Sequence, residues 1–258
     1  MRFSILIPTQ NNLSSLKCCI DSIQTHSTFQ HEILVHVSDL SKEVFEYLVA
    51  KEIEFIASPF QIDRARAYNT LFSKVSSEYI ICFTDSMRCH TKWDFHLAEE
   101  MSKSNSIHAT ICTHLQRINC DQPFESVFGT QEIDRIAGLY KFLSKKIQKY
   151  FWQKTVGAYL APYIVHKEIW EKLNGLNALY LSYEGMHVDF HIRMQLAGIS
   201  IFRTAENSII EIGPDPDFFL EINKVDVSLL KKVHGIRFQQ MKRIYVKRND
   251  ASGYMSTI

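Results

Sequence analysis

Polar side chains follow three apolar segments of this chain, at the points where those segments end. Hydroxyl, amide and carboxylate groups of this kind can hydrogen-bond the hydroxyls and N–H groups of a small ligand. The residues at these ends are Pro8, Thr9, Gln10, Asn11, Asp39 and Asp85. Because ligands of open α/β sheets bind where the carboxyl ends of parallel strands meet, the pattern predicts a binding site at one sheet edge.

Two arginines stand near the start of a predicted helix that lies between the second and third of these ends. Arg64 and Arg66 occupy its first turn, and Asn69 follows in the next. A guanidinium donates hydrogen bonds in a planar fork that suits a diphosphate, and a helix N-terminus favours anions. The segment therefore predicts a diphosphate site, with a pair of exposed surface arginines as the alternative.

Alternating strand and helix patterns predict an α/β fold with a mostly parallel sheet and helices on both faces. Strands are expected at about 3–8, 32–38, 54–57, 79–83, 107–112 and 157–165, with short ones at 199–203 and 209–212. Helices are expected at about 13–25, 42–51, 63–76, 92–103, 167–173 and 188–197. Amphipathic helices with basic faces are predicted within 119–155 and at 226–247.

Composition and missing motifs argue against several classes of protein. The net charge of +1 does not favour binding to nucleic acid. The chain has neither G-x-G-x-x-G nor G-x-x-x-x-G-K-[ST], so the usual dinucleotide fingerprint and the P-loop are absent. No apolar run approaches the ~18 residues of a membrane-spanning helix, and the first residues do not read as a signal peptide. Six cysteines without a C-x-x-C pair favour reduced thiols in a cytoplasmic protein.

The order of the motifs resembles family 2 glycosyltransferases, which have the Rossmann-like GT-A fold and use nucleotide-diphosphate sugars. The resemblance covers about residues 3–212 and includes the strand-Pro-Thr-x-Asn opening and the R-A-R-x-x-N segment that starts at Arg64. It implies that one group of side chains holds the nucleoside: Thr9, Gln10, Asn11 and Asp39. It implies that Arg64, Arg66 and Asp85 manage the charge of the diphosphate.

The D-x-D metal motif of that family is incomplete in this chain. Asp85 matches its first acid, whereas Met87 stands at the third position. A thioether is a poor ligand for Mg²⁺. Two alternatives therefore stay open: Asp85 holds Mn²⁺ or Mg²⁺ through the pyrophosphate and waters, or the donor binds without a metal.

A later segment, from Tyr183 to Gly198, resembles the family's E-D-x-D-x-x-x-R-x-x-x-x-G element and matches it at Asp189. His187 stands where inverting members have the Asp that acts as general base. Histidine is an able base near neutral pH, so His187 can take this role, and Glu184 is the second candidate.

Structural roles are the alternative for the same segment. Asp189 can cap a helix and bond Arg193 one turn later, with His187 merely packed in the core. A metal site at His187 and His191, with Asp189 between them in sequence, is disfavoured, because no further ligand is evident and the helix is expected to start near Val188.

We therefore expect a glycosyltransferase that moves a sugar from a nucleotide-diphosphate sugar, with UDP favoured, to a hydroxyl acceptor. Inversion and a place in glycan or polysaccharide biosynthesis are implied by the resemblance, with a glycan or lipid-linked molecule as acceptor. The alternative is a catalytically degenerate GT-A domain that serves as a binding or scaffolding subunit.

The expected domains are a catalytic domain at 1–215 and a basic helical C-terminal extension at 216–258. The catalytic domain divides into a nucleotide-binding half, 1–115, and an acceptor-side half, 116–215. A cytoplasmic location is expected, and contact of the basic helices with the inner face of a membrane is a further hypothesis.

Overall fold

The main sheet places the ends of its parallel strands along one edge. The structure is a computed structural model, and it describes residues 1–103, 110–112, 115–119, 162–199, 201–203, 209–213 and 224–235. The described residues form a seven-stranded sheet in the order β3-β2-β1-β4-β8-β6-β9. Its parallel part consists of β1 (Phe3–Thr9), β2 (Glu32–Ser38), β3 (Glu54–Ser58) and β4 (Tyr79–Cys82).

The strand β1 lies inside the sheet, and every one of its residues is buried. Its continuous run of Ile and Leu is typical of a parallel strand that is covered on both faces. On the other side of β4, away from β1, the direction of the strands changes. There β8 (Tyr163–His166) runs antiparallel to β4 and to β6 (Thr110–Cys112), and β9 (Ile201–Arg203) is parallel to β6.

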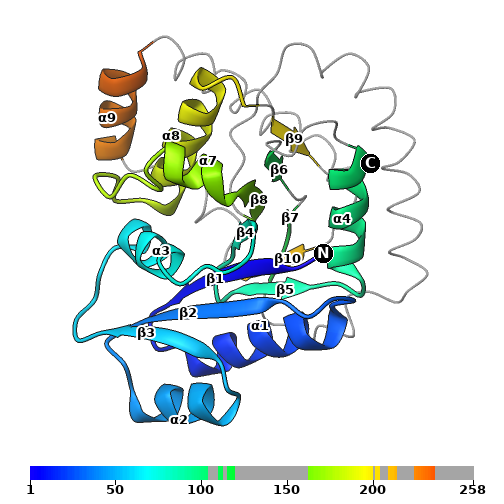
Figure 1. Cartoon of the computed structure of the whole chain (residues 1–258). Coiled ribbons are helices and arrows are strands. Elements are labelled where there is room, and N and C mark those ends of the chain that lie inside the picture. Colours follow the sequence, from blue (N-terminus) through cyan, green and yellow to red (C-terminus); the bar gives the residue numbers. More distant parts are fainter. Residues whose placement is uncertain are drawn as a thin grey trace.

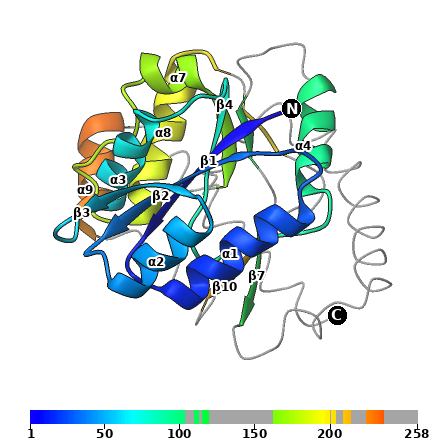
Figure 2. The same cartoon turned by 60° about the horizontal axis from the view of Figure 1, so that its bottom comes forward.

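Helices cover both faces of the parallel part, as predicted (Figure 1). One face carries α1 (Leu13–His26) and α2 (Lys42–Ala50), which come forward in Figure 2. The other carries α3 (Arg64–Phe72), α7 (Lys167–Lys172) and α8 (Tyr183–Leu196). The helix α4 (Trp93–Lys103) lies beyond the start of β1 (Figure 1). None of the helices in the described part of the chain is long and apolar enough to cross a membrane.

A second, three-stranded sheet was only partly predicted. It has the order β5-β10-β7, formed by β5 (Met87–Cys89), β7 (Leu115–Asn119) and β10 (Ile209–Gly213). The sequence predicted β10 but neither of its neighbours. β5 has three residues and follows a turn in which the Met87 N–H bonds the Thr84 carbonyl at 3.1 Å, so no alternation of polar and apolar residues reveals it.

Other boundaries also differ from the predicted ones. The helix α3 ends at Phe72 rather than near 76, and α8 begins at Tyr183 rather than near Val188. Of the strand expected at 107–112, the structure describes residues 110–112 as β6, and the rest lies outside the described residues. The basic helix expected at 226–247 is described as α9 (Lys224–His234), which ends before Gly235, a turn residue with φ of 52°; residues 236–247 lie outside the described part. The basic helix expected within 119–155 falls outside it as well.

The early start of α8 has a long-range cause. Asp226 of α9 is fully buried, and its carboxylate accepts the N–H groups of Leu181 at 2.9 Å and of Ser182 at 2.6 Å. The Ser182 hydroxyl donates to the same carboxylate. These groups precede α8, where backbone N–H groups lack partners within the helix. A carboxylate more than forty residues away in sequence therefore fixes the start of α8.

Replacing Asp226 with alanine should reduce the free energy of unfolding by about 3 kcal/mol, because it leaves buried donors without their charged acceptor. The Asp226→Asn variant keeps one acceptor oxygen and should lose about half as much. Urea unfolding of the three proteins measures both changes. Equal stability of the alanine variant and the wild type would contradict this account of the α8 start.

Candidate functional site

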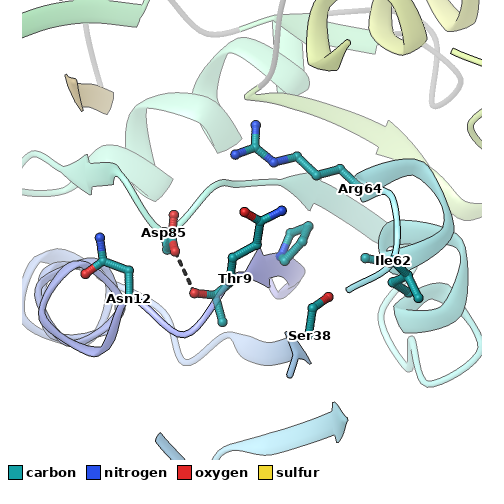
Figure 3. A pocket seen from close by; sticks show the side chains of 9 residues that line it. Thr9, Asn12, Ser38, Ile62, Arg64 and Asp85 are labelled. Atoms are coloured by element: carbon teal, nitrogen blue, oxygen red, sulfur yellow. Dashed lines mark hydrogen bonds between the residues drawn. The ribbon is translucent and has the colours of Figure 1, made fainter. Parts of the chain in front are cut away.

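A cavity of about 230 Å³ lies at the carboxyl ends of β1, β2 and β4 (Figure 3). This is the edge at which the sequence predicted a site. Typical small-molecule sites measure roughly 300–1,000 Å³, so an occupant of that size would extend beyond it. Its lining residues are Pro8, Thr9, Gln10, Asn12, Ser38, Ile62, Arg64, Ala67 and Asp85.

Asp85 is held on the cavity wall by neighbours from three elements, β1, α1 and β5. Its carboxylate accepts the Thr9 hydroxyl at 2.6 Å, the contact drawn as a dashed line in Figure 3. Its backbone carbonyl accepts the Ser15 hydroxyl and Nη1 of Arg88, each at 2.8 Å. Burial raises the pKa of the Asp85 carboxyl, while the Thr9 hydrogen bond and the charges of Arg64 and Arg88 lower it. The carboxylate is therefore fixed in position and subject to two guanidinium charges.

Arg64 enters the cavity from the first position of α3. Its side chain extends toward the side on which Asp85 lies (Figure 3), and its Cζ stands 5.4 Å from the centroid of the Tyr183 ring. The Asp63 side chain caps α3 by accepting the Arg66 N–H at 2.8 Å. Asn12 caps α1 at the opposite side of the cavity. Two helix N-termini thus border one cavity, an arrangement that favours an anion.

Asn11 and Asp39 shape the loops beside the cavity but are not among its lining residues. Both have a left-handed backbone, with φ of 59° and 57°, which Asn and Asp tolerate better than most residues. The Asn11 side chain accepts the Ser41 N–H at 3.1 Å, so it joins the loops after β1 and β2. The Asp39 side chain is exposed, and Ser41 rather than Asp39 caps α2.

Arg66 and Asn69 point away from the cavity. The Arg66 side chain is 68% exposed and forms an ion pair with Asp63 at 3.1 Å. The Asn69 side chain donates to the Leu176 carbonyl at 2.7 Å and accepts the Leu176 N–H at 2.9 Å. It thereby fastens α3 to the loop after α7. Of the three residues in this motif, only Arg64 lines the cavity.

His187 lies in the core under aromatic rings and is fully buried. Its Nδ1 is 3.0 Å from the Tyr163 hydroxyl, and its ring centroid is 4.4 Å from that of Tyr183. The Nε2 atom is buried without a hydrogen-bond partner in the described structure. Burial lowers the pKa of His187 well below its ordinary value, and the neighbouring charges of His191 and Arg64 act in the same direction. His187 is therefore a neutral imidazole in T-shaped contact with the Tyr183 ring, which the Arg64 guanidinium also contacts.

Asp189 joins three helices and is almost fully buried. Its carboxylate accepts Nε of Arg193 at 2.8 Å and faces Nε2 of His234, in α9, at 2.7 Å. Arg193 also donates to the carbonyls of Leu173 and Gly175, just after α7. The i,i+4 contact with Arg193 agrees with the structural alternative, whereas the capping role does not, because Asp189 lies inside α8. The Glu184 side chain lies outside the described part of the structure.

Acidification should destabilise this core. Burial lowers the pKa of His191 to about 4, although its Nδ1 donates to the His187 carbonyl at 2.7 Å. The unfolded chain takes up a proton near pH 6.5 that the folded chain resists until about pH 4. The contribution of neutral His191 to the free energy of unfolding is therefore present above pH 6.5 and is lost as the pH falls below it. Between pH 7 and 5 the loss from His191 is about 2 kcal/mol. Urea unfolding at both pH values, for wild type and His191→Leu, should show a shallower decline in the variant. An identical decline would contradict the assignment.

Four lining residues were missed by the sequence reasoning: Asn12, Ser38, Ile62 and Ala67. Asn12 and Ser38 adjoin the predicted Asn11 and Asp39, so the sequence located the two strand ends correctly. It did not show which of two neighbouring side chains points into the cavity. Ile62 and Ala67 flank Arg64 and gave no chemical signal. Arg88 was also missed, because its proximity to Asp85 depends on the turn before β5.

The described side chains at the cavity include few ligands for a divalent cation. Within the described ranges, no three His, Cys, Asp or Glu side chains gather as a metal-binding group. Asp85 is the single carboxylate among the described lining residues. Hard cations such as Mg²⁺ and Mn²⁺ prefer several oxygen ligands. By themselves, the described side chains therefore supply one carboxylate and no complete set of protein ligands for such a cation.

Comparisons with known proteins show the family and the fold of this chain. Residues 4–150, more than half of the chain, match the model of a family described as Glycosyl transferase family 2. Among solved structures, S. aureus TarS 1-349 in complex with UDP is 12% identical with a TM-score of 0.61, covering 95% of this chain and 70% of that one. Its complex with UDP-GlcNAc is 13% identical with a TM-score of 0.61, covering 95% and 71%. No curated protein matches this chain. At these identities the likeness shows a shared fold, the GT-A fold.

Proposed function

Because the chain belongs to glycosyl transferase family 2, we propose that it transfers a sugar from a nucleotide-diphosphate sugar to a hydroxyl acceptor. One observation carries the proposal: a cavity at the strand ends holds a fixed carboxylate and a guanidinium between two helix N-termini. The titles of the TarS structures name UDP and UDP-GlcNAc as ligands of that protein, which supports a UDP-sugar as the donor here.

The nucleoside would lie over the ends of β1 and β2. The proposed contacts are Pro8, Thr9, Gln10 and Asn11 with Asp39 at the rim. Arg64 would bind the diphosphate, because its side chain reaches into the cavity and its guanidinium can donate two parallel hydrogen bonds. Arg66 and Asn69 would act on the diphosphate indirectly, by fixing the start of α3 and its neighbouring loop.

Transfer with inversion would proceed in one displacement. A base removes the proton of the acceptor hydroxyl, the acceptor oxygen bonds the anomeric carbon, and the bond from that carbon to the diphosphate oxygen breaks. The departing diphosphate keeps the electron pair, and Arg64 is placed to stabilise the charge that develops on it.

His187 and Glu184 remain the proposed candidates for the base, and Asp189 would position α8 between its neighbouring helices. His187 can meet an acceptor only after movement of the rings that cover it, since the side chain is fully buried. Its lowered pKa leaves it neutral near pH 7, as a base must be, but makes it a weaker base than an ordinary histidine.

A second function is favoured by the burial of His187 and by the two partners of Asp189. His187 and Asp189 are both engaged in contacts inside the protein, which suits a GT-A domain that binds sugar nucleotides without transfer. Release of UDP from a panel of UDP-sugars, with simple glycan and lipid-linked acceptors, separates the two functions. Turnover with any acceptor supports the enzyme, while UDP binding without turnover supports the binding subunit.

Contact with an anionic membrane is proposed only for the basic residues after 224. Lys231 and Lys232 in the last turns of α9 are exposed. Each basic residue near an anionic surface contributes ~1 kcal/mol. We also propose the domain limits 1–215 and 216–258, a cytoplasmic location and a role in polysaccharide biosynthesis.

A further inference from the structure

The methionine in place of the second motif acid points into the core. Met87 is fully buried, and its sulfur accepts the Thr84 N–H at 3.4 Å. An acid at this position would be buried in the same place unless the turn changed. The Met87 thioether therefore takes part in the turn that carries Asp85.

A positive charge stands next to this turn. Arg88 is 8% exposed, and its Nη1 donates to the carbonyls of Asp85 and Met87, each at 2.8 Å. Burial raises the pKa of the Asp85 carboxyl, whereas the positive charges of Arg88 and Arg64 both lower it and so favour its ionised form. A D-x-D site has two carboxylates that attract a divalent cation, whereas this one combines a single described carboxylate with two guanidinium groups.

We propose that the diphosphate of the donor binds here without a divalent cation, with Arg64 and Arg88 supplying the positive charge. The inference rests on the proposed function and concerns the same cavity. Arg64 lines the cavity and would touch the diphosphate, while Arg88 is a positioning residue that holds the Asp85 turn.

Electrostatics favour this arrangement. At an effective dielectric constant of 20, two unit charges 4 Å apart interact by about 4 kcal/mol, and a divalent ion doubles that figure. A cation held by Asp85 would be repelled by both guanidinium groups and would find few oxygen ligands, which hard cations require. The anionic diphosphate is attracted by the same charges and needs no bridging ion.

Calorimetric titration of the full chain with UDP tests the proposal directly. We expect the dissociation constant in EDTA to lie within a factor of two of the values in Mg²⁺ and in Mn²⁺. The electron paramagnetic resonance signal of free Mn²⁺ should not fall when protein is added without nucleotide. UDP binding that disappears in EDTA and returns with Mn²⁺ would overturn the inference but keep the proposed function. If UDP binds in none of the three conditions, the proposed function itself is overturned.

Two substitutions at Arg88 test the source of the charge. Arg88→Gln removes the charge and should weaken UDP binding about tenfold in EDTA, whereas Arg88→Lys keeps the charge and should weaken it less than threefold. Thermal unfolding of both variants reports whether the turn survives. If the glutamine variant does not fold, the comparison of metal conditions in the wild type still decides the proposal. Equal losses in two folded variants would contradict a role for the charge.

Discussion

Replacing Arg64 with alanine should weaken UDP binding about 100-fold and leave the affinity for uridine unchanged. Arg64 is the guanidinium that lines the cavity in the described structure, and uridine lacks the diphosphate that it would bind. A charge-assisted, bidentate contact contributes about 3 kcal/mol, which corresponds to about two orders of magnitude in affinity. Calorimetric titration of both proteins with UDP and with uridine measures the difference.

Arg66 provides the matched comparison for this variant. It is the second arginine of the same motif, yet its side chain is exposed and paired with Asp63. Arg66→Ala should therefore weaken UDP binding by no more than threefold. Tyr183→Phe should behave like the wild type, because the ring under the Arg64 guanidinium is kept. Equal losses for Arg64→Ala and Arg66→Ala, or a loss of uridine binding with Arg64→Ala, would contradict the placement of the diphosphate.

Replacing Asp85 with asparagine should lower sugar transfer about 100-fold without weakening UDP binding. The asparagine keeps an oxygen that can accept the Thr9 hydroxyl, so the wall of the cavity should persist. We propose that the Asp85 carboxylate accepts a hydroxyl of the donor sugar in the transition state. Asparagine cannot offer a charged acceptor there, and loss of such a contact should raise the reaction barrier by about 3 kcal/mol. Steady-state rates together with UDP titration measure the two effects separately.

The direction of the change in UDP affinity is the informative part of this experiment. In a cavity whose positive charge comes from guanidinium groups, loss of the carboxylate leaves the attraction for the diphosphate equal or stronger. In a site bridged by metal, the same substitution removes a ligand of the ion, and UDP binding falls. A fall of tenfold or more would contradict the metal-free account, whereas an unchanged transfer rate would contradict any role of Asp85 in the reaction.

The strands and helices near the site were predictable because their signals are local. The Ile and Leu run of β1 ends at the Pro-Thr turn, and the first four strands with their helices follow the alternation of a parallel sheet. The start of α8 was not predictable, since it depends on Asp226 in α9. The same holds for β5, whose three residues carry no periodic pattern.

The site residues also divide into those with a local sequence signal and those whose placement depends on the fold. Thr9, Arg64 and Asp85 were predicted from motifs, and the structure brings them to one cavity. The direction of a side chain within a motif was not readable, so Arg66 and Asn69 looked equivalent to Arg64 although they point elsewhere. The burial of His187 was not readable from the sequence, because it depends on Tyr163 of the separate strand β8, although Tyr183 precedes it by one turn of the same helix.

A crystal structure of the chain soaked with millimolar UDP in EDTA tests the central claim most directly. The account predicts the diphosphate in the cavity between the starts of α1 and α3, with phosphate oxygens within hydrogen-bond distance of the Arg64 guanidinium. The nucleoside should lie over the ends of β1 and β2. A nucleotide bound elsewhere, or an empty cavity in crystals that hold UDP at another place, would contradict it.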